Sequence, residues 1–340
     1  MASMFGRVVS ALFGSADTPA DADRELVVET IDAFVETVEP RLRLASHYRD
    51  KLAGNVAHTI AYLRQLGTRL PRQPLELSRA AWSSNPHIRA FFAAADDVPK
   101  CIGHSDAVRE FFDSHAASAQ AYALLGMQRR ERTVLAPRLE GEVMRQDVEQ
   151  TTVSFDGHRL LAVAPDFAQC RLEVGRRIME RLAQLVLARV VQGSQQAQDR
   201  QLEKALLATR LRMLRSARDG MAPLVSEGAD IEQQIQKVER ELKEITVEPV
   251  VARTSLDATF EQINAVLAQP EQHIALAQTT MRVDRMGIKV DAGSTGEADL
   301  LDLGELSIGD GLRATIAFVQ IARDELPPQE DLLAQAQRSL

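Results

Sequence analysis

The 340-residue chain has few of the residues on which several classes of protein depend. It contains only two cysteines, Cys101 and Cys170, which excludes a disulfide framework and favours a reducing compartment such as the cytoplasm. Aromatic residues make up 4% of the chain, which favours Ala- and Leu-rich helices over a large aromatic β core. No apolar run approaches the roughly 20 residues that a membrane-spanning helix needs. The net charge of −8 argues against a protein that coats nucleic acid.

The remaining composition is that of a folded globular chain, since 45% of the residues are hydrophobic and 26% are charged. Periodicity predicts an α+β protein in which an antiparallel β domain follows a helical N-terminal domain and is split by an inserted long, coiled-coil-like helical hairpin. The predicted segments are an amphipathic N-terminal segment (1–13), a linker (14–23), a helical domain (24–118), the first half of the β domain (119–166), a helical arm (167–268), the second half of the β domain (269–326) and a C-terminal tail (327–340).

The N-terminal segment places its apolar residues on one face of a short helix. These residues are Phe5, Val8, Val9, Leu12 and Phe13. One reading is a helix that docks on a membrane surface or on a partner protein. The other reading is a helix that packs on its own protein or frays, and a secretory signal is disfavoured because the apolar core is short and only Arg7 is basic.

Within the helical domain, residues 24–70 have a helical period that Pro40 is expected to end or kink. Two shorter helices are predicted around 86–95 and 105–114. Each carries a pair of phenylalanines, at 91 and 92 in one and at 111 and 112 in the other. We expect these aromatic pairs to pin both short helices against the long helix of this domain.

The period changes from 3.6 to 2 near residue 120, which predicts strands at 122–127, 132–136 and 143–148. The pair Asp156 and Gly157 separates two β-rich runs, so it predicts a tight type I′ hairpin with Phe155 opposite His158. A second tight turn is predicted at 309–311, between strands at 305–308 and 312–319. Two similar hairpins on either side of the arm suggest that one β domain is interrupted by it.

The arm begins with a helical period of about 50 residues, which Gly193 could interrupt. A second helix over 229–246 carries apolar residues spaced like a coiled-coil seam: Ile231, Ile235, Val238, Leu242 and Ile245. Residues 204–218 carry five bases and no acid, whereas 227–244 carry six acids and three bases. Opposite charge predicts that the two helices fold back on each other. A nucleic-acid partner for the basic helix is not favoured.

No motif in the sequence indicates a specific reaction, and we predict neither a metal nor a cofactor. Cys101 and His104 lack the two further ligands that zinc requires nearby. One polar cluster at the two predicted hairpin tips is worth testing, although turn chemistry is its ordinary explanation. Its members are Asp156, His158, Arg159, Asp310 and Arg313.

The function that this organisation favours is that of a non-enzymatic binding or assembly protein, a scaffold or adaptor that acts through the helical arm. Its partners would be other proteins or further copies of itself, in the cytoplasm or at the inner face of a membrane. One alternative is a peripheral membrane adaptor that docks through residues 4–13. Another is an enzyme of unknown reaction with a site near the two hairpin tips.

Overall fold

A computed structural model describes residues 6–13, 20–140, 143–219, 228–247, 255–290, 297–309 and 311–328. The chain divides into two compact units. Unit 1 consists of Met1–Thr30, Ala57–Leu182 and Gln269–Leu340, and unit 2 consists of Ile31–Val56 and Ala183–Ala268. The division cuts across the predicted segments, whose boundaries stay a prediction.

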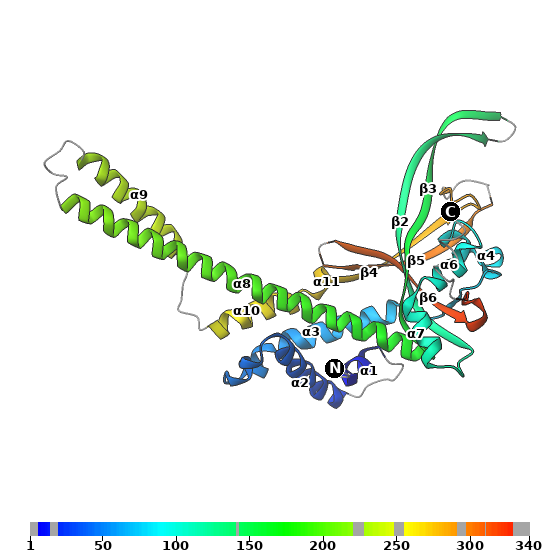
Figure 1. The fold of residues 1–340 in the computed structure, drawn as a ribbon, viewed down its shortest axis with the longest axis horizontal. Coiled ribbons are helices and arrows are strands. Elements are labelled where there is room, and N and C mark those ends of the chain that lie inside the picture. Colours follow the sequence, from blue (N-terminus) through cyan, green and yellow to red (C-terminus); the bar gives the residue numbers. More distant parts are fainter. Residues whose placement is uncertain are drawn as a thin grey trace, which may run out of the picture. The chain divides into compact units, whose positions relative to one another are not determined.

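Unit 1 is built on a six-stranded sheet (Figure 1). Five of its strands lie in the order β3-β2-β6-β5-β4, and each is antiparallel to its neighbours in this order. A short sixth strand, β1, pairs parallel with β6. The strands are β1 (Leu75–Glu76), β2 (Gln120–Glu140), β3 (Val143–Ala164), β4 (Ile274–Val283), β5 (Asp299–Ile308) and β6 (Leu312–Ala322). Strands β1 to β3 precede the arm and β4 to β6 follow it, so the predicted interruption of one β domain is confirmed.

Strands β2 and β3 are longer than the sequence pattern predicted. The separate strands expected at 122–127 and 132–136 are one strand, β2. The strand expected at 143–148 and the two β-rich runs on either side of Asp156 and Gly157 are likewise one strand, β3. The two strands pair from Tyr122 and Ala164 to Glu140 and Val143. Figure 1 shows them as a long two-stranded ribbon.

The predicted hairpin turn at Asp156 and Gly157 is wrong, because β3 runs straight through these residues. Asp156 pairs with Gln128 of β2, and Phe155 lies opposite Arg129 and not opposite His158. Gly157 has a φ of 64°, the left-handed conformation that the turn required. Here that conformation forms a β-bulge, in which residues 157 and 158 of β3 oppose a single residue of β2. The uninterrupted partner strand holds both sides of the bulge, so the chain does not reverse.

One face of the sheet is covered by four short helices, α4 (Ala81–Ser84), α5 (Pro86–Phe91), α6 (Asp97–Gly103) and α7 (Asp106–Ser114). The predicted helices at 86–95 and 105–114 are confirmed in α5 and α7, whereas α6 was not predicted. The phenylalanine pairs at 91/92 and 111/112 pack into a core with strand residues such as Leu125 and Val319. The expectation that they pin the helices against a long helix is therefore wrong, because the sheet offers them a larger apolar face.

The opposite face of the sheet receives residues from the long helices. The ring of Phe167, at the start of α8 (Phe167–Asp219), meets Phe318 of β6 edge-on with 5.1 Å between the ring centroids. The Tyr62 hydroxyl of α3 (Tyr48–Arg69) donates to the Ile274 carbonyl of β4 at 2.6 Å. The sheet is thus the middle layer of unit 1.

Unit 2 contains residues 183–268 of the segment that the sequence assigned to the arm, together with residues 31–56 of the N-terminal helices. As predicted, Pro40 ends helix α2 (Ala20–Val38), and a 3-10 turn, η1 (Pro40–Leu44), precedes α3. Helix α8 continues through Gly193 without interruption for 53 residues. Helix α9 (Gly228–Val247) matches the span predicted at 229–246 closely, and helix α10 (Ser255–Leu267) follows it. The α+β class with a long helical insertion is confirmed.

Candidate functional site

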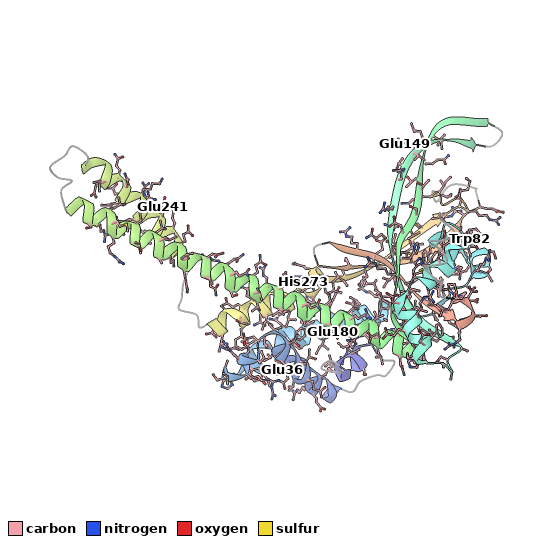
Figure 2. The ribbon with its side chains drawn as sticks, in the orientation of Figure 1. Glu36, Trp82, Glu149, Glu180, Glu241 and His273 are labelled. Carbon is pink, nitrogen blue, oxygen red and sulfur yellow. The ribbon has the colours of Figure 1, made fainter. Side chains whose placement is uncertain are left out.

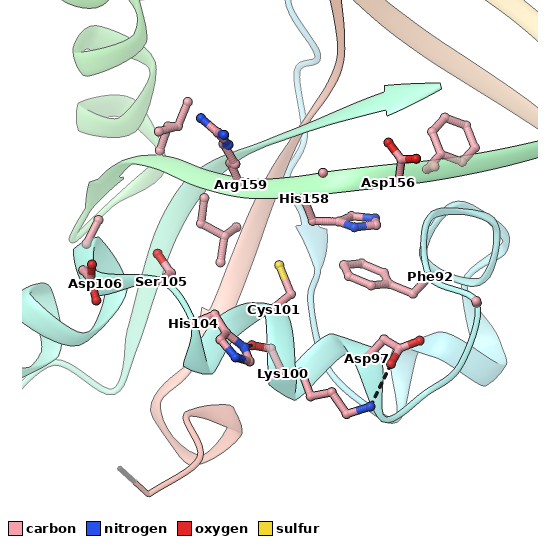
Figure 3. Close-up of a pocket in the computed structure, with 16 residues that line it drawn as sticks. Phe92, Asp97, Lys100, Cys101, His104, Ser105, Asp106, Asp156, His158 and Arg159 are labelled. Atoms are coloured by element: carbon pink, nitrogen blue, oxygen red, sulfur yellow. Dashed lines mark hydrogen bonds and ion pairs between the residues drawn. The ribbon is translucent and has the colours of Figure 1, made fainter. Parts of the chain in front are cut away.

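A pocket of about 570 Å³ lies where the β3 bulge faces the helices α6 and α7 in unit 1 (Figure 3). Three residues of the predicted polar cluster, Asp156, His158 and Arg159, line one wall. Polar residues from α6 and the turn before α7 line the other wall. The bulge creates this hollow, because it turns the side chains of successive residues of β3 out of strict alternation.

Two members of the cluster have structural roles in this pocket. His158 Nε2 donates to the Phe91 carbonyl at 2.7 Å, and its ring stacks on Phe92 with centroids 4.5 Å apart. Asp156 forms an ion pair with Arg130 of the adjacent strand at 2.7 Å. These contacts fix α5 and β2 to the bulge, so the cluster ties elements together at this position.

The facing wall also holds its polar groups in local contacts. Lys100 Nζ donates to Asp97 at 3.0 Å, and His104 Nδ1 lies 2.6 Å from the Lys100 carbonyl. The Ser105 hydroxyl caps the first turn of α7 by accepting from the Val108 amide. Burial raises the pKa of the Cys101 thiol to about 11, so it is a weak nucleophile at neutral pH.

Arg313 lines a different cavity, of about 640 Å³, on the strands β2, β4, β5 and β6. The structure therefore separates Arg313 from Asp156, His158 and Arg159, while Asp310 lies outside the described residues. The predicted reversal at 309–311 does connect β5 to β6. The sequence pattern placed these residues in one cluster because it predicted two hairpin turns, one at Asp156 and Gly157 and one at 309–311. Only the second segment connects two strands that pair with each other.

The second cavity contains polar groups that the sequence reading missed. Arg129 of β2 forms an ion pair with Glu305 of β5 at 2.6 Å. Thr315 of β6 is only 2% exposed, and its hydroxyl has no hydrogen-bond partner among the described residues. Strand alternation in the sequence could have indicated that Thr315 is buried. Its position is two residues before Ala317 and four before Val319, and both of these side chains lie in the core.

The apolar residues of the N-terminal segment are buried in unit 1. Val8, Val9, Leu12 and Phe13 of α1 (Gly6–Phe13) are each 5% exposed or less, while Phe5 lies outside the described residues. Docking of this face on a membrane or partner would therefore require α1 to leave its position. No helix in the described ranges combines the length and the apolarity needed to cross a bilayer.

The predicted seam of α9 lies against α8 in unit 2. Ile235 and Val238 are buried with Leu211 of α8, and Ile231 packs at the edge of this cluster. Leu242 is half-buried, and the side chain of Ile245 lies outside the described residues. Arg215 of α8 forms an ion pair with Glu239 of α9 at 2.7 Å, in line with the predicted charge complementarity. The structure therefore brings the two helices together on the expected side of α9.

Helix α8 also has an apolar stripe that the sequence reading missed. We call it the exposed α8 face, and it consists of Leu187, Val191, Leu202, Leu206 and Met213. Each spacing between successive members is close to a whole number of turns at about 3.6 residues per turn, so they share one side of the helix. Leu211, which packs on α9, follows Leu202 by about two and a half turns and lies on the opposite side.

In the part of the chain that the structure describes, no group of three or more His, Cys, Asp or Glu side chains is arranged to hold a metal ion. We compared the chain with models of known protein families, with curated proteins and with solved structures, and none of them matches it. The surfaces described above are therefore the basis for a proposed function.

Proposed function

We propose that the protein is a non-enzymatic binding and assembly protein that acts through its helical arm. The observation that carries this proposal is the exposed α8 face. Leu202 and Leu206 are each 63% exposed and Met213 is 68% exposed, although leucine and methionine are usually buried. Side chains project from α8 in Figure 2, and every residue from 194 to 200 is exposed.

Single exposed apolar residues are ordinary on a protein surface, but an aligned row of them is not. The row supports a binding role because one partner could cover all of its members at once. Covering apolar surface contributes about 25 cal/mol per Å² removed from water. A helix laid along the stripe would use the same packing that α9 uses on the opposite side of α8.

Site-directed photo-crosslinking in the native host tests this proposal. A photoreactive benzoylphenylalanine would replace Leu202 in one full-length variant and Leu206 in another. We expect irradiation to produce discrete adducts from both positions, because each lies at the surface that a partner would cover. Mass spectrometry of the adducts would identify the protein that is attached.

Leu44 provides the matched control, since it lies in η1 of the same unit and is 83% exposed. The same photoreactive residue at Leu44 should produce no discrete adduct. If the two α8 positions produce no adduct, or if all three positions produce the same adducts, the arm is not the binding surface and the proposal fails.

A further inference from the structure

We infer that the exposed α8 face binds a second copy of this chain, with the two α8 helices antiparallel. The inference rests on the proposed function and names the partner for the same surface. It is carried by two features of α8: a long side without charge, and a flank on which acidic and basic residues follow one another.

The arc of the α8 surface from Leu187 round to Leu206 has no charged residue between 187 and 216, and Asp199 borders this arc beside Leu206. At about 3.6 residues per turn, the positions between the apolar residues are filled by Gln195, Gln198, Ala205 and Thr209. All four side chains are exposed. A helix of the same kind can cover the centre of this side without covering a charged side chain, whose desolvation would be costly.

Charged residues follow one flank of this stripe. Glu203 precedes Leu206 by three residues and Arg210 follows it by four, so both adjoin Leu206 on the helix surface. Asp199 lies one turn before Glu203 on the same flank. All three charged side chains are exposed. This flank of α8 is thus acidic on the N-terminal side of Leu206 and basic on its C-terminal side.

This order of charges is complementary to itself only when the helices run in opposite directions. With Leu206 facing Leu206 across a two-fold axis, Glu203 of each copy lies opposite Arg210 of the other. On the other flank, Arg212 lies opposite the uncharged Gln201. A parallel pair in register would instead place this flank of each copy against the other flank of its partner, so Glu203 would not meet Arg210.

The overlap has a length suited to a reversible dimer. Residues 194–218, which include Leu202, Leu206 and Met213 of the exposed α8 face, would pair with one another, which corresponds to roughly 37 Å of helix at 1.5 Å per residue. This is about three and a half heptads of a coiled coil. We therefore expect a dimer that dissociates on dilution.

The inference is tested by light scattering after size exclusion of the full-length protein over a range of concentrations. We expect a mass approaching twice 37.5 kDa at high concentration and the monomer mass on dilution. Leu206→Asp should raise the dissociation constant at least about a hundredfold, because the two-fold axis repeats the loss in both copies. Leu44→Asp is the control and should leave the dissociation constant unchanged. Circular dichroism would establish that both variants are folded.

Charge exchange identifies the antiparallel arrangement. Glu203→Arg and Arg210→Glu should each weaken self-association by about tenfold, since each variant places like charges opposite each other twice. A mixture of the two variants should associate as well as the original protein, because both contacts between unlike copies regain opposite charges. A parallel dimer would not show this recovery.

The inference is overturned if the protein stays monomeric, if Leu206→Asp leaves the dimer intact, or if the mixed variants do not recover. The photo-crosslinking experiment separates these results from a failure of the proposed function. An adduct from Leu202 to a different protein would retain the arm as a binding surface and exclude the second copy as its occupant. The absence of any adduct would remove both proposals.

Discussion

The ring of Phe13 occupies the space that a side chain at Gly175 would need. A β-carbon added to Gly175 of α8 would lie far inside van der Waals contact of Cδ2 of Phe13. Gly67 of α3 approaches the other edge of the ring, where an added β-carbon would lie 3.2 Å from Cδ1. The Phe13 ring of helix α1 thus packs against two glycines of unit 1, where neither has a side chain to displace it.

We therefore expect Gly175→Ala to destabilise the protein by about 1–3 kcal/mol, because the new methyl group overpacks a buried ring. The free energy of unfolding in urea measures this effect. Gly54→Ala is the matched control, since no atom lies within 4 Å of an added β-carbon in that α-helix. It should stabilise the protein by about 0.5–1 kcal/mol through helix propensity. Equal effects of the two substitutions would contradict this account of α1.

The backbone of Gly157 leads to a second prediction. Its φ of 64° strains any L-residue with a β-carbon, although no atom lies within 4 Å of that position. Gly157→Ala should cost about 1–2 kcal/mol of unfolding free energy from backbone strain alone. Gly157→Asn should cost less, because asparagine tolerates this conformation better. Gly126→Ala controls for the loss of glycine, since an added β-carbon there would lie 4.0 Å from its nearest neighbour, the Arg159 carbonyl oxygen, and the φ of Gly126 is not positive. A cost at Gly126 equal to that at Gly157 would remove the role assigned to the bulge.

The bulge also shows why local sequence could not predict the β domain fully. Asp156 and Gly157 favour a left-handed backbone, and the structure supplies that conformation. Whether this conformation forms a turn or a bulge depends on pairing with β2. Asp156, for example, pairs with Gln128, which is distant in the sequence. The turn between β5 and β6 was predicted correctly because its two strands pair directly across it.

The candidate site was predictable to the same extent. Asp156, His158 and Arg159 do line one pocket, since they are neighbours in sequence. Arg313 does not join them, because its assignment depended on the first hairpin. The exposed α8 face was missed because the opposite face of the helix is also apolar. Leu202 and Leu211 lie on opposite sides, so the combined pattern has no single apolar stripe.

The two thiols provide a third prediction. Burial raises the pKa of Cys101 to about 11 and that of Cys170 to about 12, whereas an ordinary thiol titrates at about 8.5. The thiolate is the reactive form, so both cysteines should react at least about a hundredfold more slowly at pH 8 than in the unfolded chain. A chromogenic disulfide reagent in buffer and in guanidinium measures the ratio. Rapid reaction of a thiol in the folded protein would show that its burial is not maintained in solution.

The stability of unit 1 should depend on the protonation of His87 in α5. Burial lowers the pKa of His87 below its usual value, and the nearby carboxylates of Asp302 and Asp299 oppose this shift only in part. His87 Nε2 also accepts a hydrogen bond from the Asp302 amide at 3.3 Å, which requires an unprotonated nitrogen. The folded protein therefore favours the neutral ring.

The sign of the pH dependence follows from this difference. Below a pH of about 6.5, the unfolded chain protonates His87 while the folded chain resists protonation, so stability is lost as the pH falls toward the folded pKa. The loss should approach, at most, about 1.4 kcal/mol per pH unit from this group. The variant His87→Gln retains an acceptor but cannot titrate, so it isolates the histidine from other groups. We expect the stability advantage of the original protein over His87→Gln, measured by urea unfolding at pH 7.5, 6.5 and 5.5, to shrink as the pH falls. An advantage that stayed constant or grew over this range would show that His87 is not held neutral by its burial.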